Sequence, residues 1–415
     1  MTPPVLPQEI CDEIMDLAKD CSQVMKACTL VCRDWLPRAR THLFHDFTFP
    51  PDSEVQLKVY SDEIMRERLW PFIRGMNAST LTPSLFTIVC RLRFSREWLT
   101  GISIKVPKLF SRLPFQNLTH FRLYDSAPLG QCDYIVDAES LTNFLARQSS
   151  LQSLIFGDNI YFSSDYEFHK MCYRIAQSAN LHTLCIDGIH CLADRRVFQA
   201  QHLAASLPVI KSPPSLRIIK YSRDQVDTIK HFLDLHSFDA SSLDKVVVTH
   251  CLLADVAYSL WRIFKYCAST VTYLTLEISY CCPVDRNQSR EVLDKLVNLT
   301  YFELKILRED YSPADAILLK EFFELCLPSL QNLSRFIVAI VSVSWVIQCA
   351  FFDESLDTFF SALPNMSNPR LESIIVYLPV GEKELAESVM TSLPKTCGRG
   401  LLDVRLGRET DPFNV

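Results

Sequence analysis

One short pattern of apolar residues recurs along most of the chain. It is an apolar residue, two others, a second apolar residue, one other and a third apolar residue, as in Leu118, Phe121 and Leu123. The eleven units begin at Val89, Leu118, Leu151, Leu181, Leu216, Leu243, Val271, Leu299, Leu333, Leu371 and Leu401. Their starts lie about 31 residues apart on average. Apolar residues in alternation are typical of strands, so the pattern predicts one short strand in each unit.

A small polar residue directly precedes the first apolar position in eight consecutive units. These residues are Asn117, Ser150, Asn180, Ser215, Ser242, Thr270, Asn298 and Asn332. Short side chains that form local hydrogen bonds suit the turn that leads from a helix into a strand. This second signal supports the alignment of the units.

The segments between the predicted strands have helical spacing. In the segment DVAYSLWRIFKYCAS, one face carries Val256, Leu260, Ile263, Phe264 and Cys267. In the segment PADAILLKEFFELCLPS, the corresponding residues are Ile317, Leu318, Lys320, Phe322 and Leu325. In EKELAESVMTSL they are Leu385, Val389 and Leu393. One strand and one helix cannot bury their own apolar faces, but stacked units can. The pattern therefore predicts an α/β solenoid with a parallel sheet on its inner side.

From about residue 86 onward, these units resemble leucine-rich repeats. The consensus of that family is L-x-x-L-x-L-x-x-N/C-x-L, and the intervals here vary from 27 to 38 residues. The resemblance therefore implies an irregular, leucine-rich-repeat-like horseshoe with a parallel inner sheet. A doubly wound α/β fold is the alternative, and so many strands at near-constant spacing argue against it.

The first forty residues predict three small helices. Ile10, Ile14 and Leu17 lie on one face of the first. One face of the second carries Val24, Cys28, Val31 and Trp35, and a third short helix covers about 37–43. Three helices of this size bury too little surface to be stable alone. Their excess of apolar residues implies a partner, either the solenoid or another protein.

Two motifs in this region follow the pattern of one known family. The first is L-P-x-E-I-x-x-x-I, which begins at Leu6. The second is A-C-x-L-V-C-R-x-W-x-P-R-A-R-x-x-L-F, which begins at Ala27. Together they cover residues 5–44 and resemble an F-box, in particular the form found in many fungal proteins.

The F-box resemblance implies a function. An F-box docks on the Skp adaptor, which links it to a cullin ubiquitin ligase, and the solenoid would then recruit a target protein. The residues expected to contact the adaptor are Leu6, Pro7, Ile10, Ile14, Leu30, Val31 and Trp35. Helix-in-groove binding uses apolar anchors at such spacings. For Val31 and Trp35 the alternative is that they only pack the F-box against the next segment.

Three segments are therefore predicted: an F-box at 1–45, a connection at 46–85 and the solenoid at 86–415. The connection is either a solvated linker helix or an incomplete repeat that caps the solenoid. Phe44, Phe47 and Phe49 predict an opening strand near its start.

Charge and composition exclude several classes of function. The 415 residues are 48% hydrophobic and carry a net charge of −6 without a lysine or arginine run, which argues against nucleic acid and against a polybasic membrane anchor. With 9 glycines the chain has no glycine-rich phosphate loop.

The apolar stretch 336–352 is nearly long enough for a membrane span, but Ser342, Ser344 and Gln348 favour a buried strand followed by a turn or helix.

The 16 cysteines do not have the spacing of a disulfide framework. No signal peptide precedes them, so we interpret most as small buried hydrophobes in a reducing compartment, the cytoplasm or the nucleus. Cys28 and Cys32 lack a second ligand pair, and Cys185, near His182, falls in a predicted strand. The adjacent Cys281–Cys282 pair has no evident base. We expect no metal, cofactor or catalytic site.

Two readings of the whole chain remain. The first is a non-catalytic substrate receptor of a cullin ubiquitin ligase. The second is a repeat scaffold in which the N-terminal helices only cap the solenoid and no ligase assembles. In a cap, the face that includes Ile10 and Ile14 is buried against residues 46–94, whereas in an adaptor-binding module it is exposed. The target cannot be deduced, because polar residues between the strand apolars fit a solvated sheet face equally well: His120, Arg122, Arg217, Lys220, Asp244, Lys245, Glu303 and Lys305.

Overall fold

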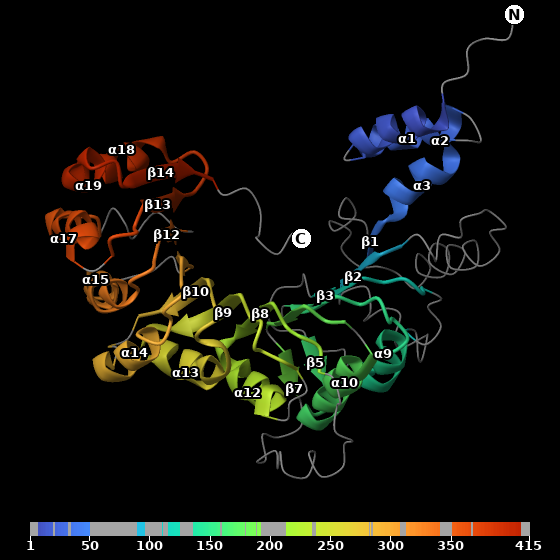
Figure 1. The fold of residues 1–415 in the computed structure, drawn as a ribbon, viewed down its shortest axis with the longest axis horizontal. Helices are drawn as coiled ribbons and strands as arrows, with labels where there is room; N and C mark the ends of the chain where they lie inside the picture. Colours follow the sequence, from blue (N-terminus) through green and yellow to red (C-terminus); the bar gives the residue numbers. More distant parts are fainter. Residues whose placement is uncertain are drawn as a thin grey trace, which may run out of the picture. The chain divides into compact units, whose positions relative to one another are not determined.

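The structure, a computed structural model, divides the chain into two compact units, Met1–Pro214 and Ser215–Val415. Figure 1 labels the helices and strands in chain order. The residues that it describes are 7–19, 21–31, 35–49, 89–95, 110, 115–124, 136–157, 160–178, 180–187, 189–191, 213–234, 238–281, 283, 285–307, 313–340, 351–366 and 368–407.

The first unit begins with three helices and continues into a parallel sheet. The helices are α1 (Gln8–Leu17), α2 (Ser22–Val31) and α3 (Leu36–Phe44). The sheet has the order β1 (Asp46–Phe49), β2 (Arg91–Ser95), β3 (His120–Tyr124), β4 (Ser153–Gly157) and β6 (Thr183–Ile186). Between these strands lie α9 (Ala138–Leu145) and α10 (Asp165–Ser178), together with β5 (Ile160–Phe162) and β7 (Ile189–Cys191), which pair with each other.

The second unit alternates strands and helices from beginning to end. Its parallel strands follow the chain order β8 (Ile218–Ser222), β9 (Lys245–Leu252), β10 (Tyr273–Tyr280), β11 (Tyr301–Ile306), β12 (Arg335–Ile340), β13 (Ser373–Leu378) and β14 (Leu402–Leu406). The helices are α12 (Val226–Asp234), α13 (Val256–Cys267), α14 (Arg286–Leu293), α15 (Pro313–Cys326), α17 (Glu354–Met366), α18 (Lys383–Ser392) and α19 (Pro394–Gly398). Short 3-10 turns are η3 (Arg223–Gln225), η4 (Leu253–Asp255) and η5 (Leu327–Ser329).

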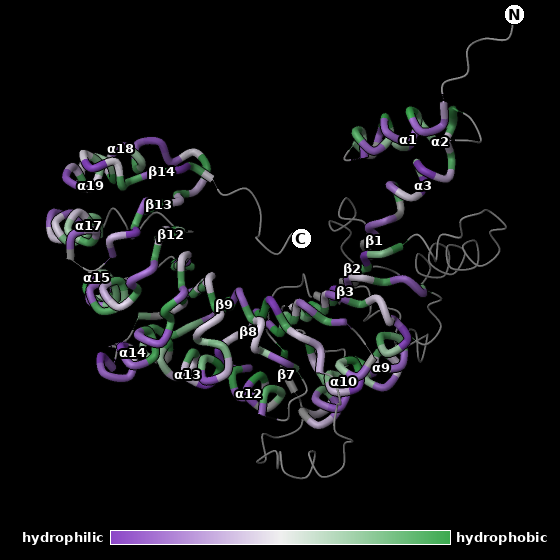
Figure 2. Tube along the Cα trace, in the orientation of Figure 1, coloured by the Kyte–Doolittle hydropathy of each residue, from purple (hydrophilic) through white to green (hydrophobic). Residues whose placement is uncertain are grey.

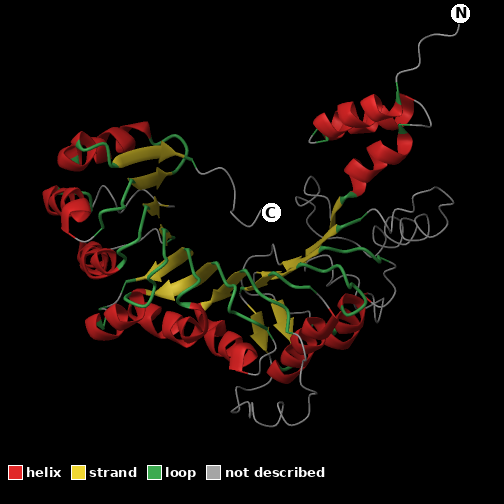
Figure 3. Cartoon of the chain, viewed as in Figure 1, coloured by secondary structure: helices red, strands yellow, loops and turns green. Residues whose placement is uncertain are grey.

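All eleven strands predicted from the repeat pattern are present, and within each unit their apolar positions pair in register except in the last repeat. In the second unit, Leu274 pairs in register with Phe302, and Phe302 with Phe336. All three side chains are fully buried. Parallel neighbours need a crossover, and here each crossover carries a helix that covers the same face of the sheet in this unit (Figure 3). The prediction of an α/β solenoid with a parallel sheet is confirmed.

The last repeat differs from its predicted register. The pattern aligned Val404 with Ile374, but the structure pairs Ile374 with Leu402 and Val376 with Val404. The slip is two residues, so every side chain stays on its expected face, because side chains in a strand alternate with a period of two. Burial alone therefore could not fix the register of this terminal strand.

The predicted faces of two helices are confirmed and that of a third is only partly correct. The predicted apolar residues of α13 and the central Leu385 and Val389 of α18 are buried. In α15, Phe322 and Leu325 are buried as predicted, but Ile317 is 58% exposed. The buried side of α15 also includes Ala316, Leu319, Phe323 and Cys326. Because this helix is apolar on nearly all sides, spacing alone did not select the packed face.

The small polar residues before the strands link consecutive repeats. The Asn332 amide donates to the Val297 carbonyl at 2.5 Å, and the Asn298 amide donates to the Ser269 carbonyl at 2.6 Å. The Thr270 hydroxyl donates both to Leu243 O at 2.8 Å and to Cys267 O at 3.0 Å. These side chains therefore satisfy carbonyls of the previous repeat as well as of their own turn.

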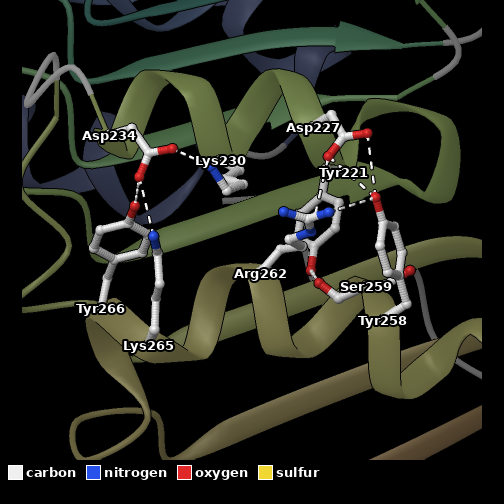
Figure 4. Close-up of polar contacts among 9 residues, drawn as sticks. All are labelled: Tyr221, Asp227, Lys230, Asp234, Tyr258, Ser259, Arg262, Lys265 and Tyr266. Atoms are coloured by element: carbon white, nitrogen blue, oxygen red, sulfur yellow. Dashed lines mark hydrogen bonds and ion pairs between the residues drawn. The ribbon is translucent and has the colours of Figure 1, made fainter.

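Adjacent helices are also joined by polar contacts, shown for α12 and α13 in Figure 4. The Tyr258 hydroxyl donates to the Asp227 carboxylate at 3.3 Å and accepts from Arg262 at 3.2 Å. From β8, the buried Tyr221 hydroxyl donates to the Ser259 carbonyl at 3.1 Å. A second group farther along the helices consists of Lys230, Asp234, Lys265 and Tyr266. Such exposed pairs add little stability individually.

The apolar stretch 336–352 begins with β12, as predicted. Phe351 and Phe352 at its end are buried, and 341–350 lie outside the described residues. No helix in the described ranges is both long enough and apolar enough to cross a bilayer.

Candidate functional site

The first N-terminal helix begins where the sequence indicates. Pro7 directly precedes α1, and its carbonyl accepts from the Ile10 amide at 3.1 Å. Proline has no amide proton to satisfy and has a backbone angle that suits this position. Glu9 lies in the first turn, where a negative charge interacts favourably with the helix dipole.

The three N-terminal helices share a small core. It consists of Met15, Met25, Cys28 and Ala39, and half-buried Trp35, Leu43 and Ala18 pack against it. A core of four residues leaves much of the apolar surface of these helices without a partner inside the module.

A charged cluster joins α1 to α3. Arg38 donates two hydrogen bonds to the Asp16 carboxylate, at 2.7 and 2.5 Å, and His42 Nε2 lies 2.7 Å from Asp16 Oδ1. The hydrogen bonds from Arg38, and then from His42, lower the pKa of Asp16 to about 2. This forked contact fixes how α3 lies against α1.

Six large apolar side chains of α1 and α2 are exposed, and we call them the N-terminal apolar surface. They are Ile10, Ile14, Leu17, Val24, Leu30 and Val31. Leu17 and Leu30 are 84% and 87% exposed, while Pro7 at the helix start is exposed as well. Hydrophobic and hydrophilic residues alternate along both helices in Figure 2. Large apolar groups gathered on so short a segment are typical of an interaction surface.

The structure leaves most, but not all, of the predicted adaptor-contacting residues exposed. Pro7, Ile10, Ile14, Leu30 and Val31 are exposed, whereas Trp35 is half-buried against the small core. Leu6 lies outside the described residues.

The residues predicted to share one face of the second helix differ in burial, and Trp35 lies beyond the end of that helix. Cys28 is buried beside Met25, but Val24 and Val31 are exposed, and α2 ends at Val31 before Trp35 is reached. The sequence pattern placed Val24, Cys28 and Val31 on one face, at i, i+4 and i+7. The residues of this helix that pack in the core are Met25 and Cys28, which are three positions apart. Leu17 and Val24 were missed as docking candidates, although their apolar character was a usable signal.

The sheet face opposite the helices of the second unit carries a packed polar network. Glu303 is fully buried and accepts from the Tyr273 and Thr275 hydroxyls at 3.1 Å each. The Tyr273 ring stacks on Tyr301, with ring centroids 4.0 Å apart, and the Lys245 amino group lies 4.4 Å from the centroid of the Tyr273 ring. Burial, and then the charge of Glu303, raise the pKa of Tyr273 well above its usual value.

For Glu303, the reading of a solvated sheet face is therefore wrong. Lys305 is also largely buried, in an ion pair with Glu277 at 2.6 Å. Parallel neighbours place these groups side by side across strands that are distant in sequence, which no local pattern indicates.

Few groups in the described ranges suggest metal or redox chemistry. Among the described residues, no set of three or more histidine, cysteine, aspartate or glutamate side chains is placed to hold a metal ion. Cys28 and Cys185 are buried, Cys281 is half-buried, and Cys32 and Cys282 lie outside the described residues.

Comparisons with known proteins assign this chain to no family. No protein-family model matches the chain, and no curated protein matches it significantly. Among solved structures, one match is described as the crystal structure of a TLR13–ssRNA13 complex. It has 11% sequence identity and a TM-score of 0.32, over 78% of this chain and 40% of that chain. A likeness of this degree carries no functional information.

Proposed function

We propose that this chain is a non-catalytic substrate receptor of a cullin-type ubiquitin ligase. Its N-terminal helices act as an F-box that docks on a Skp-type adaptor, and its repeats hold a target protein. The ligase then modifies the target in the cytoplasm or the nucleus. The chain performs no covalent step itself.

The observation that carries the proposal is the N-terminal apolar surface. A capping module would bury Ile10 and Ile14, whereas both are exposed together with Pro7. Leu30 and Val31 provide further apolar anchors on α2. Amphipathic helices that present such anchors bind in apolar grooves of partner proteins.

The mechanism is proximity. The repeats hold the target in the same assembly as the charged conjugating enzyme, so a target lysine meets the reactive thioester at a high effective concentration. A stack of repeats suits this role, because each repeat adds surface without a change in the rest of the fold.

A binding experiment with purified Skp adaptor tests the proposal. The triple variant Ile10→Ser/Ile14→Ser/Leu30→Ser removes three exposed anchors and leaves the four-residue core intact. We expect the full-length chain to bind the adaptor, and the variant to bind at least about tenfold more weakly.

The matched control is Val297→Ser/Ile317→Ser, which removes two apolar side chains, 54% and 58% exposed, from the second unit. It should bind the adaptor as the wild type does, and circular dichroism should show all variants folded. An unmodified chain that does not bind, or a triple variant that binds equally well, contradicts the proposal. The first of these results leaves a repeat scaffold that assembles no ligase.

A further inference from the structure

The last strand of the second unit has an open edge. β14 pairs with β13, both labelled in Figure 1, and within the described residues no strand pairs with the other edge of β14. The edge of a sheet presents a row of backbone amides and carbonyls that can pair with a further strand. The open edge of β14 is therefore a place at which another chain can join this sheet.

The contacts with β13 show which backbone groups lie on the open edge. The Leu401 carbonyl accepts from the Ile374 amide at 2.7 Å, and the Gly407 amide donates to the Leu378 carbonyl at 2.8 Å. Backbone groups of alternate residues point to opposite edges of a strand, so those of the odd-numbered residues of β14 point to β13. The groups on the open edge belong to the even-numbered residues Leu402, Val404 and Leu406.

The apolar side chains of β14 are less covered than those of the neighbouring strand. On β13, Ile374, Val376 and Leu378 are buried. Their register partners on β14 are half-buried or exposed, and Leu406 is 38% exposed. A strand beside β14 would cover these side chains in the way that β14 covers those of β13.

The sequence of β14 is complementary to itself in the antiparallel direction. The strand reads LDVRL from Leu402 to Leu406. When two copies pair around Val404, Asp403 of each copy lies opposite Arg405 of the other, and Leu402 lies opposite Leu406. Val404 then exchanges both backbone hydrogen bonds with Val404 of the second copy, because its amide and carbonyl point outward. Opposite charges and apolar side chains that lie directly opposite each other stabilise a sheet.

The charges also select this register over its neighbours. A shift of one residue sets outward backbone groups against inward ones, so the hydrogen bonds are lost. A shift of two residues places Asp403 opposite Asp403 of the second copy, or Arg405 opposite Arg405. Like charges in these positions destabilise a sheet, so one register is favoured.

Asp403 and Arg405 already contact each other within the strand. Arg405 donates to Asp403 Oδ2 at 2.8 and 2.5 Å and to the Tyr377 hydroxyl at 3.3 Å. The two charges are two residues apart and therefore share one face of the sheet. Pairing of two copies brings two such ion pairs side by side as a ring of alternating charges, and no charge is buried without a partner.

We propose that β14 is a dimer interface, in which it pairs antiparallel with β14 of a second copy of this chain around Val404. A two-fold interface uses the same surface on both copies, so that surface must be complementary to itself, as LDVRL is. One short strand buries little area, so the dimer is weak, with a dissociation constant in the micromolar range. This interface is separate from the N-terminal apolar surface and goes beyond the adaptor docking proposed above.

Sedimentation velocity of the full-length chain, at concentrations from about 1 to 200 µM, tests the interface. We expect the wild type to change from monomer to dimer over this range. Val404→Pro removes the central outward amide, and proline is tolerated in an edge strand whose amide faces solvent. The variant should remain folded by circular dichroism and dimerise at least about tenfold more weakly.

Charge reversal leaves the outward amides in place and changes only the cross-strand pairs. Asp403→Arg and Arg405→Asp each set like charges opposite each other, so each variant alone should dimerise about tenfold more weakly or worse. An equimolar mixture of the two places opposite charges together again and should recover most of the wild-type affinity. The double variant Asp403→Arg/Arg405→Asp should do the same. The control Arg290→Asp reverses an exposed charge on α14 and should dimerise as the wild type does.

Three results contradict the proposal: a wild type that stays monomeric, a Val404→Pro variant that dimerises equally well, or a mixture of the single reversals that associates no better than either alone. Ile10→Ser/Ile14→Ser/Leu30→Ser should dimerise as the wild type does, and loss of the dimer in that variant would move the interface to the N-terminal apolar surface. Val404→Pro should bind the adaptor normally. A dimer without adaptor binding therefore contradicts only the ligase role, and a monomer that binds the adaptor contradicts only this interface.

Discussion

Phe302 in β11 and Leu30 in α2 are both large apolar side chains, but the first is fully buried and the second is 87% exposed. Phe302 lies between register partners on both sides and its ring centroid is 5.6 Å from that of Phe336. Leu30 belongs to a three-helix module whose core has four buried residues. The same kind of side chain thus packs in the core of one region and lies on the surface of the other.

The difference lies in how many neighbours an element has. The strand of a repeat in the second unit lies between the repeat before it and the repeat after it, so the core-facing apolar residues of that strand are buried automatically. The N-terminal helices have no such series of identical neighbours. Their apolar surface is therefore available to another protein, and this contrast is the physical basis of the proposed docking function.

The largest expected effect is in the repeats. Phe302→Ala removes a fully buried ring and leaves a cavity between β10 and β12. It should lower the free energy of unfolding of the second unit by about 3–5 kcal/mol. Urea unfolding followed by far-ultraviolet circular dichroism measures this. A loss below about 1 kcal/mol would show that the repeats do not depend on this ladder.

A smaller effect concerns the cluster that joins α1 to α3. The folded-state pKa of Asp16 is about 2, against an unperturbed 3.8, so its contribution to stability is present above pH 3.8 and lost as pH falls through about 2. Arg38→Ala removes the largest cause of this shift. We expect the pKa of Asp16 to rise toward 3.8 and the acid-induced loss to move to higher pH.

Carbon-13 NMR of the Asp16 carboxyl group in the full chain measures this pKa directly. Arg40→Ala is the control, because it removes an arginine of the same helix that is not among the causes of the Asp16 shift. An unchanged pKa in Arg38→Ala would contradict the role given to the forked contact.

The smallest expected effect is at the N-terminal apolar surface. Leu30→Ser should change the free energy of unfolding by no more than about 0.5 kcal/mol, because the side chain is already in water. Met25→Ala in the same helix removes a fully buried side chain and should cost about 2 kcal/mol or more. Thermal or urea unfolding compares the two. Equal losses would erase the contrast between core and surface in this module.

The local sequence pattern predicted the repeats well, because a strand with one buried face needs apolar residues at alternate positions whatever its tertiary surroundings. It failed where several faces are equally apolar, as in α15, or where a shift of two residues preserves the face, as at β14. In α2 it placed Val24, Cys28 and Val31 on one face, whereas in the structure Met25 and Cys28 are buried in the core and Val24 and Val31 are exposed. Of the proposed docking residues, Ile10 and Ile14 could be placed on one helix face from their spacing, but the partial burial of Trp35 could not be predicted.

By itself, the sequence determined the strand of each repeat, the parallel stacking of these strands and the presence of an apolar helical start, because these depend on periodicity and on residues near one another along the chain. Only the tertiary structure decided that Glu303 is buried beneath Tyr273 and that Lys305 pairs with Glu277. Both contacts join residues about one repeat apart. They arise because parallel strands bring corresponding positions of successive repeats to within one strand spacing, a proximity that has no trace in local sequence.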